Sequence, residues 1–163
     1  FAGVINFPTV GRIDGDFRKS MADSGMSFQR EAEVMGLAGS LGLFTMAYVF
    51  NPEESKMMAD QGIDAVVAHM KTTTGGSVGS KRPMSLAEAG EKCAEIFNAA
   101  QSVKPDVLCL AHGGPIEGPE ATEYIYRHTQ AVGFVGASSV ERIPAEEAIQ
   151  KMTEKFKSQN IPK

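Results

Sequence analysis

The sequence has few cysteines, no long apolar run and no basic cluster, and each absence excludes a class of protein. Cys93 and Cys109 are the only cysteines and lack metal-ligand spacing, so we expect two buried free thiols in a reducing, cytoplasmic compartment. No apolar run reaches the roughly 20 residues that span a bilayer, and no signal peptide is visible, so we expect no membrane partner. The net charge of −4 argues against a nucleic-acid partner.

Several motifs of well-known sites are also absent. The chain has no Walker loop, no Gly-x-Gly-x-x-Gly after a strand and no Cys-x-x-Cys. His69 and His112 lack a recognisable third ligand, which disfavours zinc. Small anionic molecules are compatible with this composition, because glycine turns and helix N-termini bind anions without net positive charge.

The sequence instead contains apolar runs that alternate with amphipathic segments. The apolar runs predict strands at residues 4–7, 43–50, 65–70, 107–111 and 133–137. Helices are expected between them and after the last, with clear starts at Asn51, Ser85 and Pro144. This alternation predicts an α/β fold in which helices cover a parallel sheet. In the last helix we expect five residues to face inward: Ala145, Ala148, Ile149, Met152 and Phe156.

The length of 163 residues is that of one domain, and we expect a single domain over residues 1–163. The chain starts inside an apolar strand and without methionine. We therefore expect it to be a fragment of a longer chain.

Polar and titratable residues follow the predicted strands, whereas the strand beginnings are plain. Because the carboxyl ends of parallel strands lie at one edge of the sheet, we expect these side chains to share one cavity. The candidates are Asn6, Tyr48, Asn51, His69, Thr74, Gly75, His112, Gly113, Gly114, Ser138, Ser139 and Glu141.

The two histidines that follow strands are the candidate proton-transfer groups. His112 could act as a general acid or base, because the pKa of an imidazole lies near neutrality, or it could be a structural hydrogen-bonding residue. His69 could polarise a carbonyl group. His128 lies on a predicted helix, and we expect it at the surface.

Small residues after the last two strands indicate an anion site. Gly113 and Gly114, together with residues 136–139, would let backbone N–H groups approach a phosphate, as in (β/α)8 barrels, or they could serve only as tight turns. The hydroxyl-rich loop 72–77 could close over a ligand or be a solvated loop. Glu141 could hold Mg²⁺, act as a base or pair with Arg142.

Six motifs occur together and in order: residues 6–11, 48–54, 67–70, 73–77, 112–116 and 136–142. The set resembles the TIM-barrel family described as phosphoenolpyruvate hydrolase-like, or indole-glycerol-phosphate-synthase-like. It is also similar to the C-terminal domain of a plant virus-resistance protein. The residues that match the family motifs are Asn6, Tyr48, Asn51, His69, His112, Ser138, Ser139 and Glu141.

The resemblance implies a partial (β/α)8 TIM barrel that comprises strands four to eight. It implies an enzyme, a hydrolase or lyase, that acts on a small phosphorylated or phosphono-keto acid, with Mg²⁺ as a candidate cofactor. The Lys-x-Cys-Gly motif of the isocitrate lyase and phosphoenolpyruvate mutase group is absent.

Two other interpretations are compatible with the sequence. One is a non-catalytic ligand-binding or regulatory barrel. The other is a self-sufficient, flavodoxin-like sheet, with its ligand at the point where the strand order reverses. In a partial barrel two strand edges stay unpaired, so we expect a homo-oligomer or association with the absent N-terminal segment.

Overall fold

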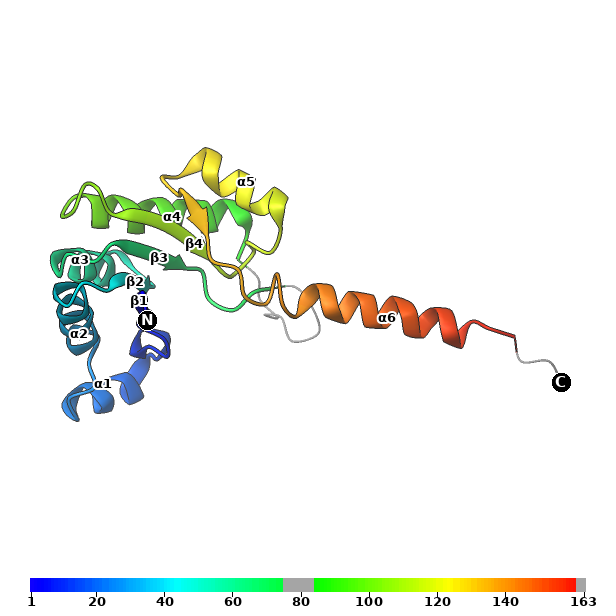
Figure 1. Cartoon of the computed structure of the whole chain (residues 1–163), viewed down its shortest axis with the longest axis horizontal. Helices are drawn as coiled ribbons and strands as arrows, with labels where there is room; N and C mark the ends of the chain where they lie inside the picture. The colour runs from blue at the N-terminus through cyan, green and yellow to red at the C-terminus, as the bar shows by residue number, and fades with distance from the viewer. Residues whose placement is uncertain (75–83, 161–163) are drawn as a thin grey trace.

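The computed structural model describes residues 1–74 and 84–160. Five strands alternate with helices along the chain (Figure 1). The strands are β1 (Gly3–Ile5), β2 (Phe44–Val49), β3 (Ala65–His69), β4 (Leu108–His112) and β5 (Gly133–Phe134). The helices are the 3-10 turn η1 (Val10–Arg12), α1 (Gly15–Asp23), α2 (Phe28–Ser40), α3 (Pro52–Asp60), α4 (Leu86–Gln101), α5 (Pro119–His128) and α6 (Ile143–Lys157).

The strands form one parallel sheet in the order β1-β2-β3-β4-β5. Each strand therefore pairs with the next one in the sequence, and the order never reverses. The flavodoxin-like alternative is wrong, because that fold needs a reversal of strand order. Successive parallel strands joined by helices are the arrangement of consecutive units in a (β/α)8 barrel, so the predicted fold class is confirmed.

The two faces of the sheet have different surroundings. Side chains such as Val49, Ala68 and Ala111 point towards the helices and belong to the buried core, together with Met58 and Phe97. Both cysteines lie in this core, as predicted. The alternate side chains of the same strands point to the opposite face, which would line the interior of a barrel. That face carries the candidate site.

The helix starts follow the predicted capping rules. The Asn51 side chain accepts a hydrogen bond from the Glu54 N–H (2.8 Å), and Pro52 takes the first helical position of α3. Ser85 and Glu88 form a capping box at the start of α4. None of the helices in the described ranges is long and apolar enough to cross a membrane.

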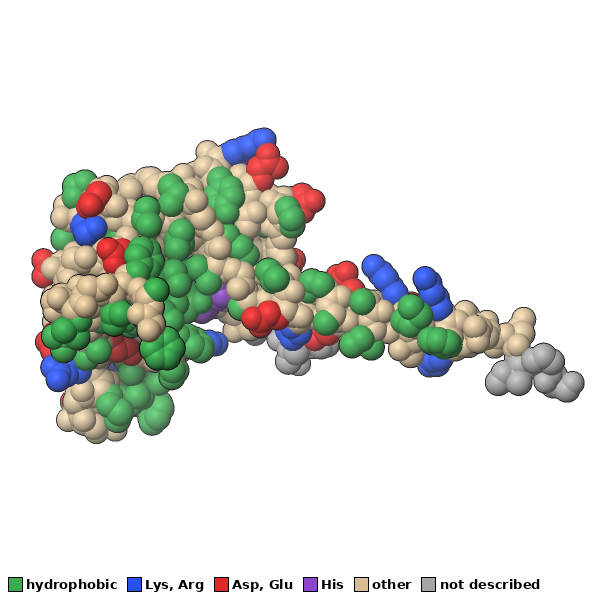
Figure 2. Space-filling model, viewed as in Figure 1, with side chains coloured by type: hydrophobic (Ala, Val, Ile, Leu, Met, Phe, Trp, Pro, Cys, Tyr) green, Lys and Arg blue, Asp and Glu red, His purple; other side chains and the backbone are tan. Residues whose placement is uncertain are grey.

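The last helix departs from its expected position. Helix α6 extends away from the sheet as an arm, and none of its residues is buried (Figures 1 and 2). The expectation that its apolar stripe faces inward is wrong: Ile149, Met152 and Phe156 are 67%, 52% and 66% exposed. β5, which precedes α6, has only two residues, shorter than predicted, and its neighbour Val132 is 70% exposed. The strand therefore offers the helix little surface to pack on.

Candidate functional site

Two histidines lie side by side at the carboxyl ends of neighbouring strands. His69 ends β3 and His112 ends β4, and the strand register pairs the two residues directly. Their ring centroids are 4.6 Å apart. The Tyr48 ring, from β2, lies 5.1 Å from each of them, and the Phe50 ring stacks on His69 at 4.8 Å. Three adjacent strands thus deliver one aromatic cluster.

Three members of this cluster, Tyr48, His69 and His112, line a cavity of about 350 Å³. Ser138, which follows β5, lines the same cavity, so four of the twelve candidate residues share it: Tyr48, His69, His112 and Ser138. A volume of this size suits a small molecule. The lining residues are Phe7, Arg12, Tyr48, His69, Lys71, Thr72, Thr73, His112, Ala137 and Ser138.

A backbone carbonyl fixes the tautomer of His112. Its Nδ1 lies 2.7 Å from the Val135 carbonyl oxygen. A carbonyl only accepts hydrogen bonds, so Nδ1 carries the proton and Nε2 keeps a lone pair. Burial lowers the pKa of His112, and the nearby Arg12 guanidinium lowers it further, while the bond to Val135 acts in the opposite direction. His112 is therefore a neutral imidazole with a free basic nitrogen.

His69 is buried and neutral as well. Its side chain is 5% exposed, and its Nδ1 has no hydrogen-bond partner among the described residues. Burial lowers its pKa to about 3, with smaller contributions from His112 and Arg12. A buried polar atom without a partner lowers the stability of the fold.

Two cations line the cavity that the sequence interpretation did not include. Arg12 ends η1, and Lys71 follows β3 by two residues. Lys71 adopts a left-handed backbone conformation (φ 67°), which is unusual outside glycine and is common at functional sites. Both residues lie in loops that follow strands. A search of those loops for basic side chains, as well as for small and titratable ones, would have found them.

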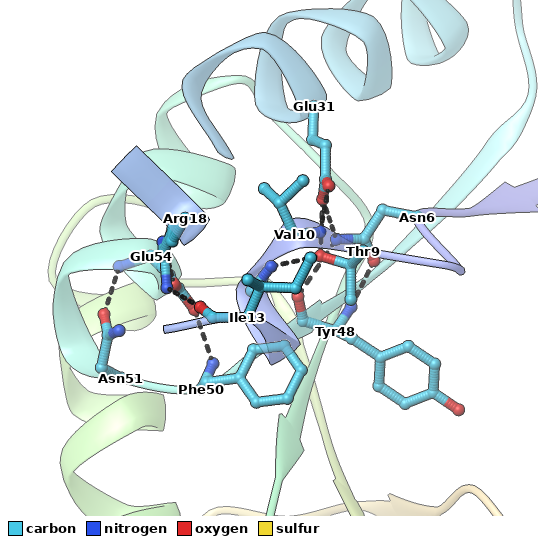
Figure 3. A network of polar contacts seen from close by, with 11 residues as sticks. Asn6, Thr9, Val10, Ile13, Arg18, Glu31, Tyr48, Phe50, Asn51 and Glu54 are labelled. Carbon is cyan, nitrogen blue, oxygen red and sulfur yellow. Dashed lines mark hydrogen bonds and ion pairs between the residues drawn. The ribbon is translucent and has the colours of Figure 1, made fainter. Parts of the chain in front are cut away.

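A network of polar contacts holds the loop that carries Arg12 (Figure 3). The Asn6 side chain extends the pairing of β1 with β2: its Oδ1 accepts from the Tyr48 N–H (2.7 Å), and its Nδ2 donates to the Tyr48 carbonyl (3.2 Å). Asn6 also donates to Glu31 of α2 at 3.1 Å. The same carboxylate accepts from the Thr9 hydroxyl and from the Val10 N–H, both at 2.6 Å.

A second carboxylate anchors the far end of this loop. Glu54 is only 3% exposed; its Oε2 accepts from the Phe50 N–H (2.9 Å) and its Oε1 pairs with Arg18 of α1 (2.5 Å). Glu54 therefore links α1, α3 and the end of β2.

The comparison with known proteins agrees with this architecture. Residues 1–159 match the family described as phosphoenolpyruvate hydrolase-like. The chain belongs to that family. This match confirms the family relationship that the six sequence motifs predicted.

Two curated relatives come from Solanum lycopersicum. The phosphoenolpyruvate hydrolase-like chain is 45% identical over 159 residues to the ToMV susceptible protein tm-1(GCR26) and to the ToMV resistance protein Tm-1(GCR237). The match covers 97% of the chain but 21% of each relative, so the chain spans about a fifth of their length.

Solved structures show weaker similarity. The N-acetylmannosamine-6-phosphate 2-epimerase of Clostridium perfringens is 18% identical with a TM-score of 0.48, over 78% of this chain and 48% of that protein. The nitroalkane oxidase of Streptomyces ansochromogenes is 23% identical with a TM-score of 0.43, over 66% and 30%.

Within the phosphoenolpyruvate hydrolase-like chain, some predicted site residues make bonds within the fold. Asn6 and Asn51 use their side chains as described above, the first to link β1 to β2 and the second to cap α3. Asn51 also lines a neighbouring cavity of about 310 Å³, which shares Arg12 and Lys71 with the histidine cavity. A contact between Asn51 and a ligand stays a prediction.

The predicted glycines bring the loop after β3 against the end of β4. A Cβ atom at Gly113 would lie 2.4 Å from the Lys71 carbonyl oxygen, and one at Gly114 would lie 2.5 Å from that of Met70. The Gly114 N–H donates to the Lys71 carbonyl (3.2 Å), which removes it from the expected group of free anion donors. These glycines thereby place the Lys71 backbone beside the histidines.

The remaining candidates lie around the rim or beyond it. Thr74 N–H donates to the Gly114 carbonyl (3.1 Å). Ser139 and Glu141 follow β5 but do not line the cavity, and Arg142 pairs with Glu146 (3.0 Å). Thr72 and Thr73 of the predicted lid 72–77 line the cavity, whereas residues 75–77, with Gly75 among them, lie outside the described residues. His128 is exposed on α5, as predicted.

The donor set does not fit a metal centre. Within residues 1–74 and 84–160, no three His, Cys, Asp or Glu side chains are close enough together to hold an ion. The cavity instead offers two cations and two neutral imidazoles, a set that suits an anion.

Proposed function

We propose that this chain forms part of an enzyme that acts on a small phosphorylated or phosphono-keto acid, by hydrolysis or by C–P or C–O cleavage. One observation carries the proposal: a pair of neutral histidines lies in a small cavity with Arg12 and Lys71. The family description, phosphoenolpyruvate hydrolase-like, supports the same substrate class.

The positions of the charged groups suggest how the substrate would bind. Arg12 and Lys71 would hold the phosphoryl or phosphono oxygens and the carboxylate, with the Ser138 hydroxyl as a further donor. His69, which lines the same cavity, would hydrogen-bond to the keto or enol oxygen. Hydrogen bonds from several directions would fix a ligand of this size in one orientation.

His112 would act as the general base. Its Nε2 lone pair would take a proton from a water molecule as that water attacks phosphorus. The P–O or P–C bond would break, the electron pair would pass to the enolate of pyruvate, and protonation of the enolate carbon would give pyruvate. The products from both substrates would be pyruvate and inorganic phosphate, so the step needs no oxidant or reductant.

A role for Mg²⁺ with Glu141 stays a separate prediction of this proposal. Since Glu141 is exposed and does not line the cavity, no step above passes through it. Activity that is unchanged by a chelating agent and by Glu141→Gln would remove both from the account.

The test of the proposed reaction is a turnover assay on the complete protein. Pyruvate and phosphate should appear from phosphoenolpyruvate or phosphonopyruvate, and His112→Ala should abolish this without loss of the fold. His128→Ala is the matched control, because His128 is exposed on α5, and it should leave turnover unchanged. Unchanged turnover in His112→Ala would remove His112 from the mechanism.

A non-catalytic binding domain is the second candidate function. The observation that favours it is the similarity to proteins named for susceptibility and resistance to a virus. Calorimetry with keto acids and sugar phosphates separates the two candidates. Binding without turnover in the complete protein would favour regulation.

A further inference from the structure

The carboxylate of Glu31 lies outside the cavity but bonds to the loop that carries Arg12. It does not line the cavity, and no cation pairs with it in the described part of the chain. Its three partners are the Asn6 amide, the Thr9 hydroxyl and the Val10 N–H, all from the segment between β1 and α1 (Figure 3). One side chain of α2 therefore fixes three points of that segment.

Two of these bonds lead to Arg12. Thr9 is the N-cap of η1, and its hydroxyl oxygen accepts from the Gly11 N–H (3.0 Å) while the hydroxyl donates to Glu31. Val10 is the first residue of the same turn, which ends at Arg12. Since η1 has only three residues, fixing its cap and first residue fixes where it presents Arg12.

The third bond leads to the aromatic cluster. Asn6 donates to Glu31 and bonds to both backbone polar groups of Tyr48, whose ring lies against both histidines. Gly11 also packs closely on Phe50, because a Cβ there would lie 2.6 Å from the ring. The loop, η1 and the aromatic wall are thus held in one arrangement.

We propose that Glu31 is a positioning residue for the anion site: it holds η1 so that Arg12 faces the pair His69 and His112. The inference rests on the proposed function only in taking the ligand to be an anion. It assigns to Glu31 no contact with the ligand.

The charge of Glu31 is needed for this role, because every partner is a donor. In Glu31→Gln, the new NH₂ group must face either the Val10 N–H or the Asn6 amide. Neither can accept: a backbone N–H only donates, and the two bonds to Tyr48 fix the orientation of Asn6. The substitution keeps the size of the side chain and removes at least one bond.

A double-mutant cycle on the full chain tests the inference. The variants are Glu31→Gln, Arg12→Gln and the two combined, with Glu33→Gln as the control on the exposed side of α2. The first readout is affinity for inorganic phosphate. The second is the ring pKa of His112 followed by NMR, with exposed His128 as the internal reference. Both readouts are independent of turnover, and the melting temperature reports the fold.

We expect Glu31→Gln and Arg12→Gln each to weaken phosphate binding, by about tenfold for a lost hydrogen bond to a charged group. The double variant should resemble Arg12→Gln alone, since Glu31 acts through Arg12. The pKa of His112 should rise in all three variants, and Glu33→Gln should resemble the unmodified chain. Thr9→Val, which removes one hydroxyl, should weaken binding in the same direction and serves if Glu31→Gln does not fold.

Three results would overturn the inference. One is a lower melting temperature in Glu31→Gln with phosphate affinity and His112 unchanged, which indicates a structural role alone. Another is an equal loss of affinity from Glu31→Gln with and without Arg12. The third is no phosphate binding by the unmodified chain. If the double-mutant cycle shows that Glu31 and Arg12 are coupled in phosphate binding, but no phosphorylated keto acid is turned over, only the proposed enzyme activity is contradicted.

Discussion

His69 and His112 determine how the site responds to pH. Two imidazolium ions with rings 4.6 Å apart in a buried site would repel each other and would also lose their hydration. The nearby Arg12 guanidinium would be a third positive charge beside them. The pair therefore stays neutral at pH 7, and the positive charge of the site is that of Arg12 and Lys71.

The first prediction concerns stability in acid. The pKa of His69 is about 3 in the folded chain, below its ordinary value, so the unfolded chain binds the proton more readily. The contribution of His69 to stability is therefore complete above pH 6.5 and is lost as pH falls from about 6.5 towards 3, with a slope of up to about 1.4 kcal/mol per pH unit. Denaturant unfolding across this range measures it. His69→Gln should flatten the curve and His128→Gln should not; equal slopes in both variants would contradict the assignment.

The second prediction separates backbone strain from close packing. Gly62 and Gly113 both have positive φ, 75° in each case, but only Gly113 has backbone atoms within 4 Å of the position of a Cβ. Gly62→Ala should cost about 1–2 kcal/mol of unfolding free energy, the penalty of a left-handed alanine. Gly113→Ala should cost about 3 kcal/mol or more and displace Lys71. Similar costs for the two substitutions would show that the Lys71 backbone does not pack on Gly113.

The residues at the strand ends were predictable from the sequence, whereas the two cations of the cavity were not. His69 and His112 end their strands and Ser138 lies in the loop after β5, so strand direction alone predicts that they lie at the same edge of the sheet. Arg12 and Lys71 reach the cavity only because of η1 and a left-handed residue. Those turns depend on contacts with Glu31 and with Gly113 and Gly114, which come from distant parts of the chain.

Among the elements, α3 shows how one residue can serve both the fold and a site. Asn51 caps the helix and also lines the cavity of about 310 Å³ that neighbours the histidine cavity. Its position in a family motif does not tell these roles apart. The two roles require different atoms, however, because the cap uses only an acceptor oxygen.

The third prediction uses that difference. Asn51→Ala should lower the unfolding free energy by about 1 kcal/mol through loss of the cap, whereas Asn51→Asp should keep it. If Asn51 also contacts an anionic ligand, Asn51→Asp should weaken phosphate binding by placing a negative charge beside it. Thermal melts and calorimetry on both variants measure the two effects. Full phosphate affinity in Asn51→Asp would restrict Asn51 to the cap.

The strands and most helices were predictable because apolar periodicity and capping residues are local signals. The arrangement of α6 was not. Its stripe of Ile149, Met152 and Phe156 predicts that an apolar surface becomes covered, but periodicity does not identify what covers it. A β5 of two residues, which the apolar run 133–137 did not reveal, leaves the helix without a place to pack.

The molecule as a whole exposes many large apolar side chains. Phe44 and Leu108 lie on the face opposite the helices and are 46% and 44% exposed. β1 and β5 each have one edge without a neighbouring strand in the described sheet. From these surfaces and the α6 stripe we predict association, either with a second copy or with a further segment of the barrel.

The fourth prediction tests this association. The chain alone should sediment with a mass above that of the 17.4 kDa monomer. Ile149→Glu, Met152→Glu and Phe156→Glu together should lower that mass if α6 takes part. Gln150→Glu with Lys157→Glu adds the same negative charge away from the stripe and is the control. A monomer at every concentration would contradict the prediction.

The central claim is that the ends of successive strands form one anion-binding cavity around His69 and His112. Nitrogen-detected or long-range ¹H–¹⁵N NMR of the histidine rings, during titration with phosphoenolpyruvate, tests it most directly. The account predicts that the signals of His69 and His112 shift together along one saturable curve, while those of His128 stay in place. No shift of the paired histidines at saturating ligand, or an equal shift of His128, would contradict it.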